Sequence, residues 1–361
     1  YRAKDFCIRM LPAGCIISHM TPAVFAHSGC SKEFIIGFLN SRLIKFLVRV
    51  QSNVFDSGII ESLPWRSIDL LSIERVEKIT RSCIEAKRQL SHFDETDSLF
   101  VGLPSARSLE ELRRCWNNEY ATSQKTICEG LKEIDSTIDS VYGIDSDKLL
   151  ATIDLETDDD SESMESEENN EFAFTGQLGN NAVTSAVLSY CVGLIVGRWD
   201  ATASLENLRS TRIPPLFEEL PSFQPGALRE CYGHLGSDMP KSYPMRIESE
   251  GVLVDDFDST HDIVLRVRDV LEVIWKGRAE TIEKEACDIL GVKDLREYFR
   301  KPGKGGFWDD HISRYSKSRR KAPIYWLLQS SKKNYAIWLY YHRLDKDLLF
   351  KALVNYVEPK I

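Results

Sequence analysis

The stretch Leu109–Tyr142 constrains the fold most, because its apolar residues recur at helical spacing over about nine turns. Gly143 follows, and glycine commonly ends a helix. The stretch Ile68–Leu90 has the same spacing. Two long helices joined by a loop predict an antiparallel pair that acts as a spacer. The apolar positions of the longer helix include Leu112, Ile127, Leu131, Ile134, Ile138 and Val141.

Shorter segments complete an α+β, mainly helical prediction. One helix is expected over 31–50, with Ser31 as its N-cap. Further helices are expected over 182–200, 262–275 and 279–291, and a last one within 345–357 that Asp345 caps. The segment Cys7–Ser18 has the composition of strands around a Pro-Ala-Gly turn.

An aromatic β-hairpin is expected near the C-terminus. The segments Ala322–Ser331 and Asn334–Arg343 are rich in Trp, Tyr and Ile and flank two lysines. The preceding residues, Phe307–Lys321, are expected to form a loop. The aromatic residues of the two strands include Tyr325, Trp326, Trp338 and Tyr340. We expect about half of them to be buried by packing within the hairpin, and stacking on unpaired bases is the alternative role.

The net charge of −9 comes almost entirely from one acidic run, Asp154–Glu171, which holds ten acids and no base. The other residues carry 46 bases and 45 acids, a net charge of +1. Like charges with few apolar neighbours predict a flexible linker that is dispensable for folding. Local basic patches can then dominate what the folded part binds.

Composition excludes several classes of protein. No run of eighteen apolar residues is present, so no membrane span is expected. The nine cysteines include no Cys-x-x-Cys pair, which predicts reduced thiols in a cytoplasmic protein. The first residue is Tyr1, and we expect a fragment of a larger protein.

Catalytic signatures are absent from the sequence. It has no glycine-rich phosphate loop, no dinucleotide fingerprint and no Gly-x-Ser-x-Gly elbow. Asp309, Asp310, His311 and His342 are conceivable metal ligands, but polar residues of a loop and a hairpin end explain them better, and we expect no metal.

The strongest functional signal is basic. Between Arg296 and Lys333 there are eleven Lys or Arg residues against three acids, which suits a phosphate backbone. A second basic edge follows the helix around Asn40–Arg49 and is expected to read bases. The candidate DNA-binding residues are Arg42, Lys45, Arg49, Arg300, Lys301, Lys304, Arg314, Lys317, Arg319, Arg320, Lys321, Lys332 and Lys333.

These segments resemble a known family. "FLNSRLIKFLVR" followed by "SGIIESLPW" (Phe38–Trp65) looks like the recognition region of large adenine-specific DNA methyltransferases, in which a Leu-Asn-Ser helix precedes an Ile-x-x-Leu-Pro strand. Glu133–Asp145 is similar to the family's segment that closes a long helix, and Leu188–Asp200 to its Gly-Arg-Trp-Asp element. Phe307–Leu344 looks most like the C-terminus of BREX phage-exclusion methyltransferases, the PglX family, whose relatives include single-chain restriction–modification enzymes.

The resemblance implies which part of such an enzyme this chain is. The family's Asn-Pro-Pro-Tyr motif and its S-adenosylmethionine loop are both missing, and "NNEY" (Asn117–Tyr120) lacks the prolines. The cofactor is therefore implied for a parent protein and not for this chain. The resemblance implies that residues 1–67 are part of a target-recognition domain of mixed structure. Together with the patterns above, it predicts a long helical spacer pair (68–150), an acidic flexible linker (151–180) and a C-terminal helical domain with the hairpin (181–361).

Two hypotheses of different classes remain. In the first, the chain binds double-stranded DNA beside its N-terminal methyltransferase domain. In the second, it is a scaffold that docks other defence-system proteins. A self-contained hydrolase is a weaker third. Binding that weakens steeply with salt would favour the first hypothesis over the second.

Overall fold

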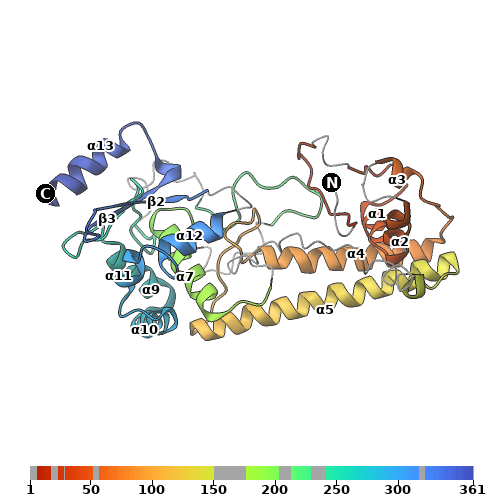
Figure 1. The fold of residues 1–361 in the computed structure, drawn as a ribbon, viewed down its shortest axis with the longest axis horizontal. Coiled ribbons are helices and arrows are strands. Elements are labelled where there is room, and N and C mark those ends of the chain that lie inside the picture. The colour runs from red at the N-terminus through yellow and green to blue at the C-terminus, as the bar shows by residue number, and fades with distance from the viewer. Residues whose placement is uncertain are drawn as a thin grey trace, which may run out of the picture. The chain divides into compact units, whose positions relative to one another are not determined.

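The computed structural model describes residues 6–17, 23–27, 29–51, 57–149, 176–202, 213–228, 239, 241–316 and 322–360. The acidic run Asp154–Glu171 and the cations Lys317, Arg319, Arg320 and Lys321 lie outside them. Within these ranges the protein is mainly helical and has a small three-stranded antiparallel sheet (Figure 1). No helix in the described part of the chain has the length and apolar character needed to cross a membrane.

The chain divides into two compact units. The first comprises Tyr1–Leu90, Tyr120–Glu168 and Pro214–Leu220. The second comprises Ser91–Glu119, Asn169–Ile213 and Pro221–Ile361. The four-part division expected from the sequence stays a prediction.

The first unit begins with a pair of short helices where one helix was expected. Ser31 caps α1 (Lys32–Leu39), because its Oγ accepts the N–H of Phe34 at 3.0 Å. A break at Asn40 and Ser41 separates α1 from α2 (Arg42–Gln51). The Asn40 amide donates to the carbonyl of Ile36, and the Ser41 hydroxyl donates to that of Phe38. Such local side-chain bonds compete with continuation of a helix.

The long helices match the sequence prediction closely. Helix α4 spans Leu70–Ser91 and α5 spans Leu109–Tyr142, and Gly143 follows α5 with φ +68°. Within the first unit they run antiparallel, since Arg75 bonds Glu133 whereas Cys83 lies beside Thr126. A Cβ at Gly130 would lie 2.5 Å from the Cys83 sulfur, so glycine permits this close approach.

Two expected strands of the first unit are absent. The described part of Cys7–Ser18 forms no strand, and the Ile8 backbone instead bonds the Asn40 amide at 3.0 and 2.8 Å. The expected Ile-x-x-Leu-Pro strand is also wrong. Its isoleucine, Ile60, lies in helix α3 (Ser57–Glu61), and Leu63 is buried in the core. The Pro64 carbonyl accepts a hydrogen bond from the Tyr142 hydroxyl.

The second unit is built around one helix that is buried on all sides. Every residue of α7 (Asn180–Ile195) from Ala182 onward is buried, and the helix packs against α9 (Ile263–Trp275) and α10 (Ala279–Leu290). Its glycine also permits a close approach of Trp199, which follows the helix. A Cβ at Gly193 would lie 2.3 Å from the Trp199 ring.

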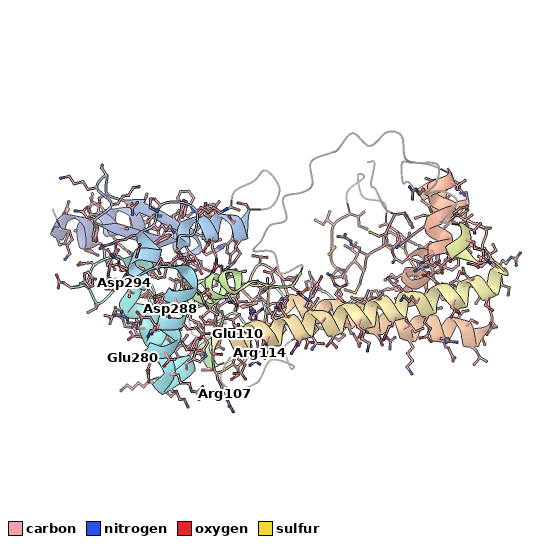
Figure 2. All side chains as sticks on the ribbon, turned by 60° about the horizontal axis from the view of Figure 1, so that its bottom comes forward. Arg107, Glu110, Arg114, Glu280, Asp288 and Asp294 are labelled. Carbon is pink, nitrogen blue, oxygen red and sulfur yellow. The ribbon has the colours of Figure 1, made fainter. Side chains whose placement is uncertain are left out.

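The start of α5 is fixed to α10 by a carboxylate. The N–H groups of Leu109 and Glu110 donate to the two oxygens of Glu285, at 3.1 and 3.0 Å, and the N–H of Glu111 donates to Ser108 Oγ. Figure 2 shows Glu110 at this end of α5, with Glu280 and Asp288 on α10. Three otherwise unsatisfied donors of a helix terminus are thereby bonded.

The expected hairpin is present. Strand β2 (Tyr325–Gln329) pairs antiparallel with β3 (Ala336–Tyr340), and Tyr325 lies opposite Tyr340. A third strand, β1 (Val252–Val254), adds to β3 and gives the order β1-β3-β2. Three residues are too few for a sequence pattern to predict a strand.

The C-terminal segment covers one face of the sheet. Helix α13 (Leu348–Ala352) continues as a π-helical turn (Leu353–Val357) and a 3-10 turn (Glu358–Lys360). Leu348 and Ala352 pack on Val252, Val254, Ile337 and Leu339. The expected helix is therefore present, but it begins at Leu348, and its N-cap is Asp347 and not Asp345.

The prediction of a loop over Phe307–Lys321 is wrong for its first part. Residues Phe307–Tyr315 form helix α12, which follows α11 (Leu295–Arg300). Phe307, His311 and Arg314 lie at helical spacing and are buried, although two of them are polar. Because two of these buried residues are polar, the pattern of hydrophobic residues does not indicate the buried face of this helix.

Candidate nucleic-acid interface

Four exposed lysines of the second unit lie in two loops. Lys301 and Lys304 are exposed in the loop between α11 and α12, and Lys332 and Lys333 are exposed in the turn between β2 and β3. The Gln329 amide at the end of β2 donates to the Arg300 carbonyl at 3.5 Å, which connects the hairpin to the first loop.

The loop between α11 and α12 depends on glycine. Gly303 and Gly305 have φ of +138° and +79°, which side-chain-bearing residues rarely adopt. A Cβ at Gly306 would lie 2.3 Å from the Lys301 carbonyl oxygen. The backbone therefore turns tightly here, with both lysines at its surface.

The turn of the hairpin is fixed by Ser330. Its Oγ accepts the N–H groups of Asn334 and Tyr335, both at 3.2 Å, and its carbonyl accepts the N–H of Lys333 at 2.8 Å. Lys333 has φ +55°, in the left-handed region. The ordered turn leaves Lys332 and Lys333 as neighbouring exposed cations.

Arg314 does not fit the predicted role. It was expected in an exposed loop, but its side chain is 2% exposed and its Nη1 lies 2.8 Å from Glu95 Oε1. Its Nη2 donates to Ser185 Oγ at 2.8 Å. Burial alone would lower the pKa of Arg314, but the Glu95 carboxylate holds that pKa above its usual value. The described geometry makes Arg314 part of the core.

Arg300 is also ion-paired. Its Nε contacts Asp255, a carboxylate shared with the buried Arg296, and Arg296 donates in turn to both oxygens of Asp262. The Arg300 side chain is 36% exposed. Arg300 thus links the basic loop to a buried ionic cluster and is only partly available to a ligand.

The cations of the first unit lie on α2. Arg42 Nε is 3.1 Å from Asp135 Oδ2, and its guanidinium also contacts Asp147. Asp135 further accepts the Arg42 N–H at 2.8 Å, which places the carboxylate at the start of α2. Lys45 is half-buried and Arg49 is exposed.

Two of the four conceivable metal ligands, Asp310 and His311, have other partners. Asp310 accepts the Tyr298 hydroxyl at 2.6 Å, and burial raises the pKa of Asp310. His311 Nε2 accepts the N–H groups of Ile324 and Tyr325 at 3.0 and 3.1 Å, and burial lowers the pKa of His311. In the described residues, no three His, Cys, Asp or Glu side chains are grouped as a metal site would require.

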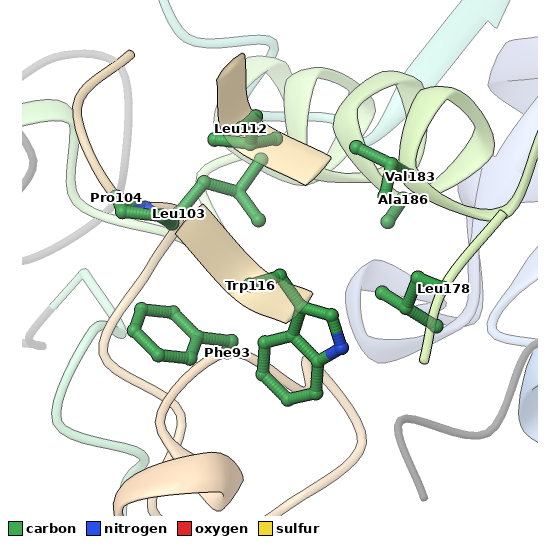
Figure 3. Close-up of a pocket in the computed structure, with 8 residues that line it drawn as sticks. All are labelled: Phe93, Leu103, Pro104, Leu112, Trp116, Leu178, Val183 and Ala186. Atoms are coloured by element: carbon green, nitrogen blue, oxygen red, sulfur yellow. The ribbon is translucent and has the colours of Figure 1, made fainter. Parts of the chain in front are cut away.

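A cavity in the second unit does not fit S-adenosylmethionine (Figure 3). It measures about 20 Å³, room for a single water molecule. Its lining is apolar and has no group for the cofactor's ribose or carboxylate. The residues are Phe93, Leu103, Pro104, Leu112, Trp116, Leu178, Val183 and Ala186.

Comparison with models of known protein families found no match. The chain is similar to the adenine-specific methyltransferase BrxX of Escherichia coli O9:H4 (strain HS), with 23% identity over an alignment of 384 residues. The similarity covers 98% of this chain and 29% of the relative. The chain therefore spans less than a third of the length of the methyltransferase that it matches.

Proposed function

We propose that this chain is a DNA-binding part of an adenine-specific DNA methyltransferase from a phage-defence system, either BREX or restriction–modification. The similarity to BrxX along almost the whole chain carries the proposal. The sequence contains neither an Asn-Pro-Pro-Tyr motif nor a glycine-rich cofactor loop. Methyl transfer and S-adenosylmethionine are accordingly assigned to the rest of the parent protein, and the partner of this chain is double-stranded DNA.

Within this proposal, the two units have different tasks. The first includes part of the recognition domain (1–67) and reads bases through the region Asn40–Arg49. The second belongs to the C-terminal domain (181–361) and holds phosphates. Phosphate contacts position a protein on DNA but carry no base identity. The exposed lysines Lys301, Lys304, Lys332 and Lys333 support the second role.

Salt-dependent titration of fluorescent duplexes tests the phosphate contacts. Changing Lys301, Lys304 and Lys332 to Ala should weaken binding similarly for all sequences and lower the salt slope by about one unit per lost contact. The same holds for Arg319, Arg320 and Lys321. Lys284→Ala, which removes an exposed lysine of α10, is the control. An unchanged salt slope in both triple variants would refute the proposed phosphate role.

The assignment of methyl transfer to the rest of the parent has its own test. The chain is incubated with labelled S-adenosylmethionine and an adenine-containing duplex. We expect no label in the DNA above background. Incorporation of label would show that the chain itself holds a catalytic site.

A scaffold that docks other proteins is the second candidate. The observation that favours it is an exposed apolar surface at the C-terminus, where Leu349, Phe350, Leu353 and Val354 are between 37% and 70% exposed. Exposed apolar patches mark contact surfaces. Binding through this surface should change little with salt, whereas duplex binding should weaken steeply.

A further inference from the structure

We propose that the face of the β2–β3 hairpin that carries Trp326 and Leu328 binds an unpaired stretch of DNA. The bases stack on Trp326 and Tyr341, and the phosphates contact Lys332 and Lys333 in the turn. The inference rests on the proposed DNA-binding function and adds a class of ligand to it. The fold leaves the side chains of Trp326 and Tyr341 uncovered on this surface.

The two aromatic rings form an exposed, nearly parallel pair. Trp326 is 48% exposed and Tyr341 is 50% exposed. Their ring centroids are 6.2 Å apart, and their planes differ by 15°. The indole N–H of Trp326 donates to the Pro323 carbonyl at 3.1 Å, which satisfies its polar atom and restrains the ring. Ordered rings with free surface suit base stacking, which needs little sequence preference.

The hairpin does not need this pair for its own packing. Tyr325, Trp338 and Tyr340 are all buried, and they supply the aromatic core on the opposite face of the hairpin. The ring of Trp338 packs edge-on against Phe307 at 5.1 Å. Trp326 is therefore the large hairpin aromatic that burial does not explain.

Strand register explains why Trp326 is uncovered. Trp326 lies opposite Leu339, and Leu328 lies opposite Ile337, so all four share one face of the sheet. Leu348 and Ala352 cover Leu339 and Ile337 in the central strand. Because β2 is at the edge of the sheet, its residues on this face extend beyond that cover, and Leu328 is 47% exposed.

Charge decides between a nucleic acid and an apolar protein partner. The segment from Ala322 to Leu344 contains no Asp or Glu and has Lys332, Lys333 and Arg343. The hairpin itself therefore presents no carboxylate that would repel phosphate. From Trp326 to Ser330, the residue after β2, the extended chain covers about 13 Å, close to the rise of about four stacked nucleotides. Stacking requires a free base face, which a duplex does not offer, so the ligand is single-stranded.

The experiment compares three fluorescent 12-mers with the full chain: single-stranded DNA, the same backbone without bases, and a duplex. We expect Trp326→Ala and Tyr341→Ala each to bind single-stranded DNA at least fivefold more weakly. Trp326→Phe should restore most of the affinity, because a ring remains. Lys332→Ala and Lys333→Asn should lower the salt slope by about 0.7 unit each, and equally for the strand without bases.

Each outcome bears on the inference. The inference fails if Trp326→Ala and Tyr341→Ala bind single-stranded DNA as tightly as the parent does and melt at the same temperature. It also fails if the parent binds the strand without bases as tightly as it binds single-stranded DNA. Duplex binding within twofold of the parent in the same variants supports it.

If the parent binds the duplex but those variants lose no affinity for the single strand, only this inference fails. If the parent binds no DNA at all, the proposed function fails with it. Loss of self-association in Trp326→Ala, measured by sedimentation, would instead assign the surface to protein contact.

Discussion

Arg314 Nη1 and Glu95 Oε1 are 2.8 Å apart in the interior of the second unit, where their side chains are 2% and 4% exposed. The two residues are far apart in the sequence, and Glu95 also accepts the Ser189 hydroxyl at 2.5 Å. Arg314 bonds both the carbonyl and the hydroxyl of Ser185. The pair thus joins α12 to α7 and to the segment that precedes α5.

Removing one member of this pair should destabilise the fold strongly. Arg314→Ala leaves the Glu95 carboxylate buried without its main partner, and we expect a loss of about 3–5 kcal/mol in the free energy of unfolding. Urea unfolding measures it. Lys332→Ala, at an exposed cation of the same unit, should change stability by less than about 0.5 kcal/mol. Equal effects of the two changes would contradict a structural role for Arg314.

The carboxylate of Glu285 should contribute to stability as a helix cap. Glu285→Ala removes the acceptor for two N–H groups at the start of α5, and we expect a loss of about 1–2 kcal/mol. Glu280→Ala is a matched control, because Glu280 is an exposed carboxylate on the same helix (Figure 2). Chemical denaturation of both variants compares them, and similar losses would refute the capping role.

Close approach at Gly193 predicts a sensitive position. A methyl group there would lie 2.3 Å from the Trp199 ring, so Gly193→Ala should destabilise the second unit by about 1–3 kcal/mol. Gly176→Ala lies ahead of the same helix, where a Cβ would meet nothing within 4 Å. The melting temperature of Gly176→Ala should stay near that of the parent. A tolerated Gly193→Ala would show that Trp199 can move aside.

Protonation of His311 should weaken the fold at low pH. Burial lowers the pKa of His311, and the charges of Arg314 and Arg198 lower it further. Below the unfolded-state pKa of about 6.5, the unfolded chain takes up a proton that the folded chain excludes. Stability therefore falls as the pH decreases, by at most about 1.4 kcal/mol per pH unit from this group. His311→Gln keeps an acceptor for the N–H groups of Ile324 and Tyr325, and its unfolding free energy should show a smaller decline between pH 6.5 and 5.

The helices and the hairpin were predictable because local patterns determine them. Helix α5 has the predicted bounds, and Ser31 caps α1 as expected. Strand β1 and helix α12 were missed for physical reasons. Strand β1 exists through pairing with β3, which is distant in sequence. Helix α12 buries His311 and Arg314. A prediction from the spacing of hydrophobic residues misses a helix whose buried face contains polar residues.

The candidate site was only partly predictable. A count of basic residues treats Arg314 and Lys332 alike, although one is buried against Glu95 and the other is exposed. Ion pairs such as Arg300 with Asp255 and Arg42 with Asp135 join residues that are distant in sequence. Their partners become known only once the chain is folded, so composition overestimates the free positive charge.

The hairpin from Ala322 to Leu344 has no carboxylate, and this determines how its charge responds to acidity. Acidification therefore neutralises no negative charge within this segment. Burial lowers the pKa of His342, so this imidazole takes up a proton only at a pH below its ordinary range. The attraction of the segment for anions thus comes from its cations alone and not from a balance of opposite charges. Dissolved salt screens those cations, so ionic strength controls the attraction.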